Sequence, residues 1–358
     1  MQKALSNLSP EQAKSVRKSI LVSAAFGITS VATSFTFKAI FSSYKFEAYF
    51  TLLGLQMILT LLFCTFLKHN CRKVPGLEVP DIDIKLVQKS LFAGLLFVTN
   101  IAVGFAGLKR VNIPMFLTVR RTTTVFTLIA EYYMLQKIAS NKVQFGIALT
   151  VLGALVAGYD SLNSDWIGYA WTLGNNAATA ASWSATKRFS DDNKIRGFGL
   201  TMYNALVALP LCIILAISSG EITYLMNYPH LGETKFLLAL LACSTLGVTM
   251  NYVVFLCTTS TSPLATAVTG NIKDIGATLL GAYIFGDFIP NFSRVLGILI
   301  SFLGSGIFSV AKLQEASMEK PKEDTIVSTP TGRYINTYNN NDTINSNRPT
   351  SPRGNNNV

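Results

Sequence analysis

Four basic residues lie inside stretches of the chain that are otherwise apolar enough to sit in a lipid bilayer. Arg120 and Arg121 stand side by side in "VRRTTTVFTLIAE", and the other two are Lys38 and Lys273. A charge inside a membrane is costly, and such residues usually face a partner or a water-filled cavity. Arginine forks suit phosphate oxygens, and lysine supplies a compact positive charge. The four cations therefore favour a binding site for an anionic substrate.

Two acidic residues in the same stretches offer an alternative explanation. Glu131 could form a structural ion pair with one arginine, and Asp274 could pair with the adjacent Lys273. Internal pairing of this kind would leave two of the four cations unmatched, so an anionic substrate explains more of the pattern. No catalytic nucleophile or acid pair stands out, and we expect neither an enzyme nor a cofactor. The five cysteines lack metal-ligand spacing, and no metal is expected either.

The elements that carry these residues must be membrane helices. Half of the chain is hydrophobic, only 14% is charged, and the mean hydropathy is +0.39. A helix needs about 20 residues to cross the hydrocarbon layer, and the long apolar runs satisfy that length. The sequence predicts an all-α polytopic membrane protein with ten spans, at residues 20–40, 46–67, 90–108, 113–136, 143–160, 166–186, 198–219, 235–257, 263–285 and 290–311.

The distribution of Lys and Arg predicts the orientation of these spans. If both termini are cytosolic, 21 of the 30 basic residues face the cytosol and five face the opposite side. Such asymmetry follows the positive-inside rule. The net charge of +11 is therefore mainly a signal of topology, and nucleic acid is not an expected partner.

An internal repeat relates the two halves of the chain. The segment "GIALTVLGALVAG" (146–158) aligns without gaps with "GILISFLGSGIFS" (297–309), so that Gly146 matches Gly297 and Gly153 matches Gly304. The same offset maps each of the first five spans onto one of the last five. Because five is odd, the second copy must enter the membrane from the opposite side, as in the inverted repeats of secondary transporters.

The predicted organisation has four parts. Residues 1–19 form a cytosolic N-terminal segment in which Ser9 and Pro10 start a short surface helix. Residues 20–160 and 166–312 are the two five-helix repeats. Residues 313–358 are rich in Asn, Thr and Ser, a composition typical of a disordered tail.

Four segments of the sequence resemble one family of transporters. They are "FKAIFSSYKF" in the first span, "NIPMFLTVRRTTTVFTLIAE" in the fourth, "MYNALVALP" in the seventh and "TGNIKDIGATLLGAYIFGD" in the ninth. The chain is similar to the nucleotide-sugar transporters of the drug/metabolite transporter superfamily. The nearest branch carries UDP-glucuronate, UDP-N-acetylgalactosamine and UDP-N-acetylglucosamine. The resemblance covers residues 20–312, with Phe37 replacing the usual Asn before Lys38.

The resemblance implies a set of substrate-binding residues. Lys273 and one of the two arginines would neutralise a pyrophosphate, and Gly270 would let the backbone approach the ligand. Tyr203 and Asn204 would read the base or ribose, with interhelical hydrogen bonding as their alternative role. The full predicted set is Lys38, Tyr44, Arg120, Arg121, Asn175, Tyr203, Asn204, Gly270, Asn271 and Lys273. Asn176, beside Asn175, is also polar enough to line the cavity.

The resemblance implies an antiporter in the Golgi or endoplasmic reticulum membrane that exchanges a cytosolic UDP-sugar for luminal UMP by alternating access. Its partners would be these nucleotides and membrane lipid, and a homodimer stays open. A GDP-sugar antiporter for GDP-mannose or GDP-fucose is the alternative. GDP-mannose carriers resemble this branch but have a second Asn where this chain has Ala205. A sugar-phosphate translocator and a membrane scaffold without transport activity are further alternatives.

Overall fold

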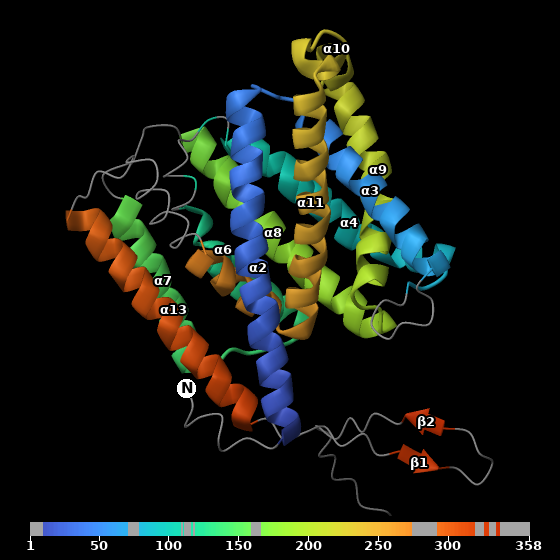
Figure 1. Cartoon of the computed structure of the whole chain (residues 1–358). Coiled ribbons are helices and arrows are strands. Elements are labelled where there is room, and N and C mark those ends of the chain that lie inside the picture. The colour runs from blue at the N-terminus through green and yellow to red at the C-terminus, as the bar shows by residue number, and fades with distance from the viewer. Residues whose placement is uncertain are drawn as a thin grey trace, which may run out of the picture. The chain divides into compact units, whose positions relative to one another are not determined.

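The computed structural model describes residues 10–70, 79–108, 110, 116, 119–158, 166–273, 292–318, 326–328 and 334–336. Within these residues the regular structure is almost entirely α-helical, as Figure 1 shows. Contacts divide the chain into two compact units, Met1–Ser317 and Met318–Val358. The helices belong to the first unit, and the second contains two short strands.

The described residues form a series of helices along the chain. Residues 263–273 are helical as well. The other helices are α2 (Pro10–Ser43), α3 (Tyr49–Asn70), α4 (Ile84–Leu108), α6 (Thr123–Leu135), α7 (Asn141–Gly158), α8 (Trp166–Asn193), α9 (Phe198–Ser218), α10 (Glu221–Met226), the 3₁₀-helix η2 (Pro229–Gly232), α11 (Thr234–Ser260) and α13 (Phe292–Met318).

Seven of the predicted spans coincide with apolar helices. Four helical stretches are long and apolar enough to cross a membrane, namely Tyr49–Asn70, Ile84–Gly107, Phe198–Ser218 and Thr234–Ser260. Three shorter apolar stretches are Ser19–Thr33, Asn141–Val156 and Val295–Ala311. The prediction of a helical, multi-pass membrane protein is confirmed. The exact number of ten spans stays a prediction, because most of the ninth span lies outside the described residues.

The first span is longer than its apolar core. α2 runs from Pro10 to Ser43 without interruption, whereas the sequence predicted a separate short surface helix ahead of a span over 20–40. The intervening residues, "EQAKSVRKS", contain neither Gly nor Pro and are mostly good helix formers. Because nothing in this segment ends a helix, the surface helix and the span become one element.

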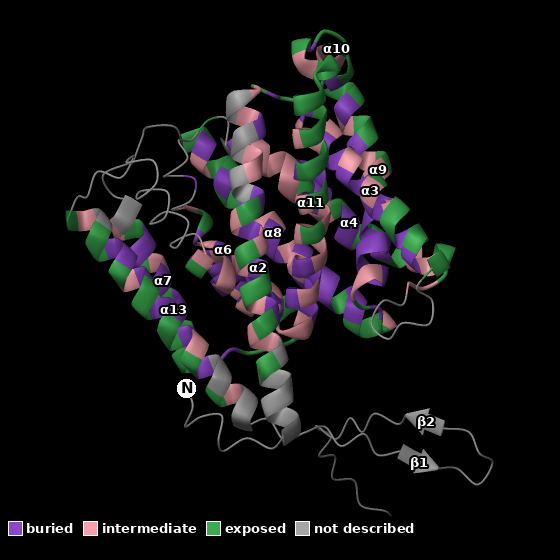
Figure 2. Ribbon diagram, in the orientation of Figure 1, coloured by how far each residue is buried: buried purple, intermediate pink, exposed green. Residues whose placement is uncertain are grey.

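The helices bury their small and polar faces and expose large apolar side chains. α4 packs against α8 and α9, α6 packs against α8, and α11 packs against α2 and α3. Figure 2 shows exposed residues along the outer faces of these helices. They include Phe66, Leu62 and Ile214, each about 60% exposed. A soluble protein would not tolerate so much exposed apolar surface, whereas a membrane protein turns it toward lipid.

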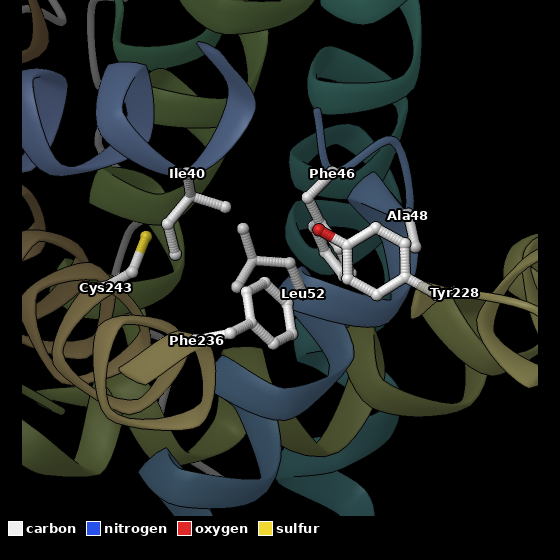
Figure 3. Packing of buried hydrophobic residues seen from close by; sticks show 7 residues of the cluster. All are labelled: Ile40, Phe46, Ala48, Leu52, Tyr228, Phe236 and Cys243. Carbon is white, nitrogen blue, oxygen red and sulfur yellow. The ribbon is translucent and has the colours of Figure 1, made fainter. Parts of the chain in front are cut away.

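A hydrophobic cluster packs where α2 ends and α3 begins. It consists of Ile40, Phe46, Ala48, Leu52, Tyr228, Phe236 and Cys243, drawn in Figure 3. These residues join the end of α2 and the start of α3 to η2 and α11. Glu221 lies on α10, and its carboxylate accepts hydrogen bonds from the N–H groups of Phe50 and Thr51 at 3.0 and 2.7 Å. It therefore caps the N-terminus of α3.

The helices α7 and α13 lie side by side and pack through glycines (Figure 1). A Cβ atom added at Gly146 would lie 3.0 Å from the carbonyl oxygen of Gly304, and one added at Gly153 would lie 2.6 Å from that of Gly297. Because the later glycine of α7 meets the earlier glycine of α13, the two helices are antiparallel. We call this contact the glycine seam.

The centre of the glycine seam is a hydrogen bond between equivalent positions of the predicted repeat. Thr150 and Ser301 are 151 residues apart, as are Gly146 and Gly297. The hydroxyl of Ser301 donates to the carbonyl oxygen of Thr150 at 2.8 Å. A two-fold relation between the helices would bring matching residues together in this way.

The second unit contains one antiparallel pair of strands, β1 (Ile326–Ser328) and β2 (Tyr334–Asn336). Val327 lies opposite Ile335 in the register. An isolated pair of strands is marginal in water, so this pairing does not amount to a packed core. The remainder of the tail, for which the composition predicts disorder, lies outside the described residues.

Candidate functional site

The arginine segment is interrupted where the sequence predicted one continuous span over 113–136. The N–H of Thr122 donates to the carbonyl oxygen of Val119 at 3.0 Å, and the N–H of Val125 donates to that of Thr122 at 2.9 Å. These bonds span three residues, as in a 3₁₀ turn, and such a turn inside a helix often marks a functional site. Residues 121–122 form the turn, and α6 begins at Thr123.

A buried asparagine from α8 stabilises this turn. The side-chain amide of Asn176 donates to the carbonyl oxygen of Val119 at 2.8 Å and to the hydroxyl of Thr122 at 2.9 Å. Asn176 is fully buried. The tight turn frees backbone groups that a regular helix would pair, and buried polar groups need partners. Asn176 therefore compensates for the broken helix at the arginine pair.

The two arginines point into different surroundings. Arg120 is exposed, whereas Arg121 is only 5% exposed. One guanidinium nitrogen of Arg121, Nη1, donates to the hydroxyl of Ser301 at 3.2 Å. The same hydroxyl donates to Thr150 at the centre of the glycine seam. Arg121 thus joins the interrupted helix to the contact between α7 and α13.

The helix at 263–273 passes the arginine turn. The side-chain amide of Asn271 donates to the carbonyl oxygen of Arg121 at 3.5 Å, and Asn271 is 4% exposed. Lys273 lies two residues further and is half-buried. A Cβ atom added at Gly270 would meet nothing within 4 Å in the described part of the chain. The structure therefore brings Asn271 against Arg121, and Gly270 and Lys273 are neighbours of Asn271 on the same helix.

Tyr203 lies elsewhere, near the start of α9. It is fully buried, its hydroxyl donates to the carbonyl oxygen of Asp81 at 2.9 Å and accepts the N–H of Asp83 at 3.2 Å. Its ring packs edge-on against Phe189 at 6.1 Å. Asn204, the next residue, is 7% exposed. In this conformation Tyr203 fixes the non-helical segment ahead of α4.

Tyr44 and Asn175 also make contacts away from the arginine turn. The ring of Tyr44 packs against that of Phe236, near the N-terminus of α11, with the ring centroids 5.2 Å apart. Asn175 uses its amide nitrogen to reach the carbonyl and side-chain oxygens of Asn100 on α4, at 2.6 and 2.7 Å. The side chain of Lys38 and the whole of Asp274 lie outside the described residues.

Comparison with known proteins decides the family. Residues 19–309 match the model of the Triose-phosphate Transporter family. The chain belongs to the Triose-phosphate Transporter family. Its members and the relatives below are transporters, so this chain is a transporter and not an enzyme.

The relatives of this family member carry more specific names. The UDP-N-acetylglucosamine transporter UGNT1 of Arabidopsis thaliana is 29% identical over 72% of this chain and 77% of its own length. The nucleotide sugar transporter SLC35D2 of Mus musculus is 30% identical over 75% and 80%. The GDP-mannose transporter GONST2 of Arabidopsis thaliana is 25% identical over 66% and 64%. A solved structure described only as "Crystal structure of protein" shares the fold, with a TM-score of 0.59, 15% identity, and coverage of 82% of this chain and 98% of its own.

Glu131 has a different contact from the one that the sequence suggested. Its carboxylate is 4% exposed and accepts the backbone N–H of Leu264 at 2.6 Å. The contact places a negative charge at the N-terminus of the helix at 263–273, where the helix dipole favours it. The predicted pairing of Glu131 with an arginine stays a prediction.

Lys187 is a buried residue of this transporter that was not expected from the sequence. Its ammonium donates to the carbonyl oxygen of Thr259 at 2.6 Å and lies 3.3 Å from the carboxylate of Asp191. Burial lowers the pKa of the Lys187 ammonium, and the charge of Asp191 acts in the opposite direction. Lys187 lies one residue beyond the predicted sixth span. It is one of the 21 basic residues that the predicted orientation places on the cytosolic side. The spacing to Asp191 is the only signal in the sequence that could have drawn notice to it.

Proposed function

We propose that this chain is a nucleotide-sugar antiporter that exchanges a cytosolic UDP-sugar for luminal UMP by alternating access. The observation that carries the proposal is the buried Arg121 at an interrupted helix, next to the 270–273 segment. Interrupted membrane helices with nearby polar groups form the substrate sites of many secondary transporters. The UDP-sugar assignment is supported by the names of the relatives, among them a UDP-N-acetylglucosamine transporter.

The proposed architecture has ten spans in two inverted five-helix repeats, over residues 20–160 and 166–312. The glycine seam supports it, because Gly146 and Gly153 contact the predicted repeat partners of each other. The hydrogen bond between Thr150 and Ser301 supports it as well. In inverted-repeat transporters the substrate site lies near the midplane where the two copies meet, and Arg121 bonds to Ser301 at such a meeting point.

In the proposed site, Arg121 and Lys273 provide the positive charge for the pyrophosphate. The guanidinium can turn part of its fork toward phosphate oxygens, and the ammonium of Lys273 supplies a point charge. Gly270, with open space on its Cβ side among the described residues, lets a ligand approach the backbone. Asn271 holds the helix to the arginine turn and presents its amide there.

The remaining predicted residues have secondary places in the proposal. Arg120 and Lys38 would attract the anion on its way to the site. Tyr44, Tyr203 and Asn204 would contact the nucleoside in a conformation other than this one, because Tyr203 is engaged by the backbone of Asp81 and Asp83 here. Asn175 would act mainly by holding α8 to α4 through Asn100.

Charge balance supports exchange as the mechanism. A UDP-sugar carries about two negative charges on its pyrophosphate, and a nucleoside monophosphate carries about −1.5 to −2 near pH 7. The same cationic site can hold either ligand, and the exchange moves little net charge. No ion gradient is needed. We place the transporter in the Golgi or endoplasmic reticulum membrane, with both termini in the cytosol.

Counterflow in proteoliposomes tests the proposal. Purified protein is reconstituted into vesicles preloaded with UMP, GMP, CMP or AMP, and labelled UDP-N-acetylglucosamine is offered outside. The expected result is uptake driven by UMP alone. Uptake driven mainly by GMP would replace the proposal with the GDP-sugar alternative, for which the more distant relative GONST2 is the present support.

Phosphate-loaded vesicles address the second alternative, a sugar-phosphate translocator, which the family description favours. Exchange of labelled phosphate for a triose phosphate, with no nucleotide uptake, would establish that activity instead. Folded protein that transports none of these compounds would return Arg121 to a structural role.

A further inference from the structure

The turn between α11 and the helix at 263–273 is held from two sides by opposite charges. On one side Lys187 of α8 donates to the carbonyl oxygen of Thr259 at 2.6 Å. On the other side Glu131 of α6 accepts the N–H of Leu264 at 2.6 Å. Only residues 260–263 separate the two contacts. A cation thus lies at the C-terminus of one helix and a carboxylate at the N-terminus of the next, which is the favourable arrangement at both helix ends.

The first N–H groups of the second helix are all accounted for. Pro263 has no N–H to satisfy, which suits the first position of a helix. The N–H of Ala265 donates to the hydroxyl of Ser262 at 3.1 Å, and that of Thr266 donates to the Ser262 carbonyl oxygen at 3.0 Å. Leu264 is the one position that requires a partner from another helix, and Glu131 is that partner.

The helices that supply the two charges also build the arginine turn. α6 begins just after Arg121, and α8 contributes Asn176, which bonds to the backbone and to Thr122 there. The helix at 263–273 therefore has two contacts with this part of the chain: Leu264 with Glu131 of α6, and Asn271 with Arg121 in the turn ahead of α6. The two contacts are seven positions apart on one helix. A displacement of the turn would be transmitted to Gly270, Asn271 and Lys273.

We propose that Glu131 and Lys187 are positioning residues for the transport site. They clamp the turn at residues 260–263 and thereby set the place of Gly270, Asn271 and Lys273 against Arg121. The inference rests on the proposed function only in taking these residues as the substrate site. If the two residues were purely structural, their contacts would stabilise the fold without affecting ligand binding. The experiment must separate these two roles.

The chain offers matched controls for both residues. Arg188 follows Lys187 on the same helix, but its side chain is 61% exposed and it pairs only loosely with Asp192, at 3.8 Å. Lys187→Met and Arg188→Met therefore remove the same charge from neighbouring positions. Glu221 is a second buried carboxylate that caps a helix, α3, which carries neither Arg121 nor any residue of the 270–273 segment. Glu221→Gln is thus the control for Glu131→Gln.

The first readout needs no ligand. Ser260 is replaced by Cys in a chain whose five natural cysteines are replaced, and the rate of reaction with a water-soluble maleimide is measured in detergent. Lys187→Met should raise this rate about tenfold, because a hydrogen bond to a charged group contributes roughly that factor or more. Arg188→Met should leave it unchanged. Equal rates in the two variants would overturn the clamp.

The second readout is the concentration of UMP that gives half-maximal thermal stabilisation. Glu131→Gln and Lys187→Met should raise this UMP concentration by a factor of about five to ten. Glu221→Gln should lower the melting temperature and leave the UMP concentration for half-maximal stabilisation unchanged. Lys187→Arg, which keeps a donor, should restore most of the affinity. Unchanged UMP affinity in folded Lys187→Met protein would make the clamp purely structural. If the unmodified chain binds no nucleotide, the proposed function fails, and the maleimide rates still decide whether the clamp exists.

Discussion

Two sets of glycines in this transporter face opposite surroundings. At Gly153 on α7 an added Cβ atom would lie 2.3 Å from the backbone nitrogen of Ser301, and at Gly304 on α13 it would lie 2.5 Å from that of Thr150. At Gly270 the same atom would meet nothing within 4 Å among the described residues. Small residues let membrane helices approach closely, so the glycine seam is explained by packing. Packing against the described residues does not explain Gly270.

The difference separates structural glycines from a glycine that we assign to the substrate. Along the seam, backbone atoms of one helix occupy the space that a side chain would take. Next to Gly270, Asn271 bonds to the backbone of Arg121 and not to another glycine. The sequence alone could not distinguish the two kinds of glycine, because both lie in apolar runs of similar composition.

The largest expected effect comes from filling the seam. Gly153→Leu places a branched side chain where backbone atoms of α13 already lie, and overpacking of this kind costs about 3 kcal/mol or more. We expect loss of folded protein, measured as monodisperse material after detergent extraction and as melting temperature. A folded Gly153→Leu variant with an unchanged melting temperature would contradict the close packing of α7 and α13.

The next largest effect should come from Arg121. Arg121→Met keeps the length of the buried side chain but removes the charge and the donor to Ser301. We expect UMP-driven counterflow to fall about a hundredfold, the loss of roughly 3 kcal/mol of charge-assisted binding. Ser301→Ala is the control, because it removes the same hydrogen bond and leaves the charge. If both variants lost transport equally, Arg121 would act through the seam and not through the substrate.

A smaller effect is expected from the asparagines of α8. Asn176→Leu removes the two bonds that support the arginine turn, whereas Asn175→Leu removes a contact between α8 and α4. Both should destabilise the protein by about 1–3 kcal/mol. Only Asn176→Leu should also reduce counterflow in protein that remains folded, and comparison of the two initial rates checks this.

The smallest effects should come from open glycines. Gly306 on α13 and Gly270 both have free space for a Cβ atom among the described residues. Ala in place of Gly at either position should stabilise the helix by up to about 1 kcal/mol. Gly270→Ala alone should raise the KM for the nucleotide sugar, by about threefold if the methyl group displaces the ligand slightly. Equal KM values in both variants would remove Gly270 from the site.

The sequence predicted the membrane helices well where hydropathy decides their bounds. α9 begins at Phe198, as predicted, and ends at Ser218, one residue before the predicted end. α8 runs on to Asn193, seven residues beyond the predicted end. Its last turns contain Lys187 and Arg188, which end an apolar window without ending a helix. Hydropathy therefore locates the membrane and not the full length of an amphipathic helix.

The candidate site was predicted in part. The sequence singled out Arg121 and the segment around Lys273, and the structure brings Asn271 of that segment against Arg121. The interruption at Arg121 and Thr122 could not be predicted, because no Gly or Pro marks it. It depends on Asn176, a residue 54 positions from Thr122 in the chain. The buried contacts of Lys187 and Glu131 are likewise set by tertiary packing and have no local signal.

The most direct test of the proposed substrate site is the UMP-induced shift in the melting temperature of the Gly270→Leu variant. A ligand that binds only the folded state stabilises it in proportion to its occupancy. We expect the unmodified chain to melt at a higher temperature with UMP. Without UMP the variant should melt at or slightly above the unmodified temperature, because leucine favours the helix more than glycine does, and UMP should not raise this temperature further. A rise of the same size in Gly270→Leu would contradict the assignment of the 270–273 segment to the substrate.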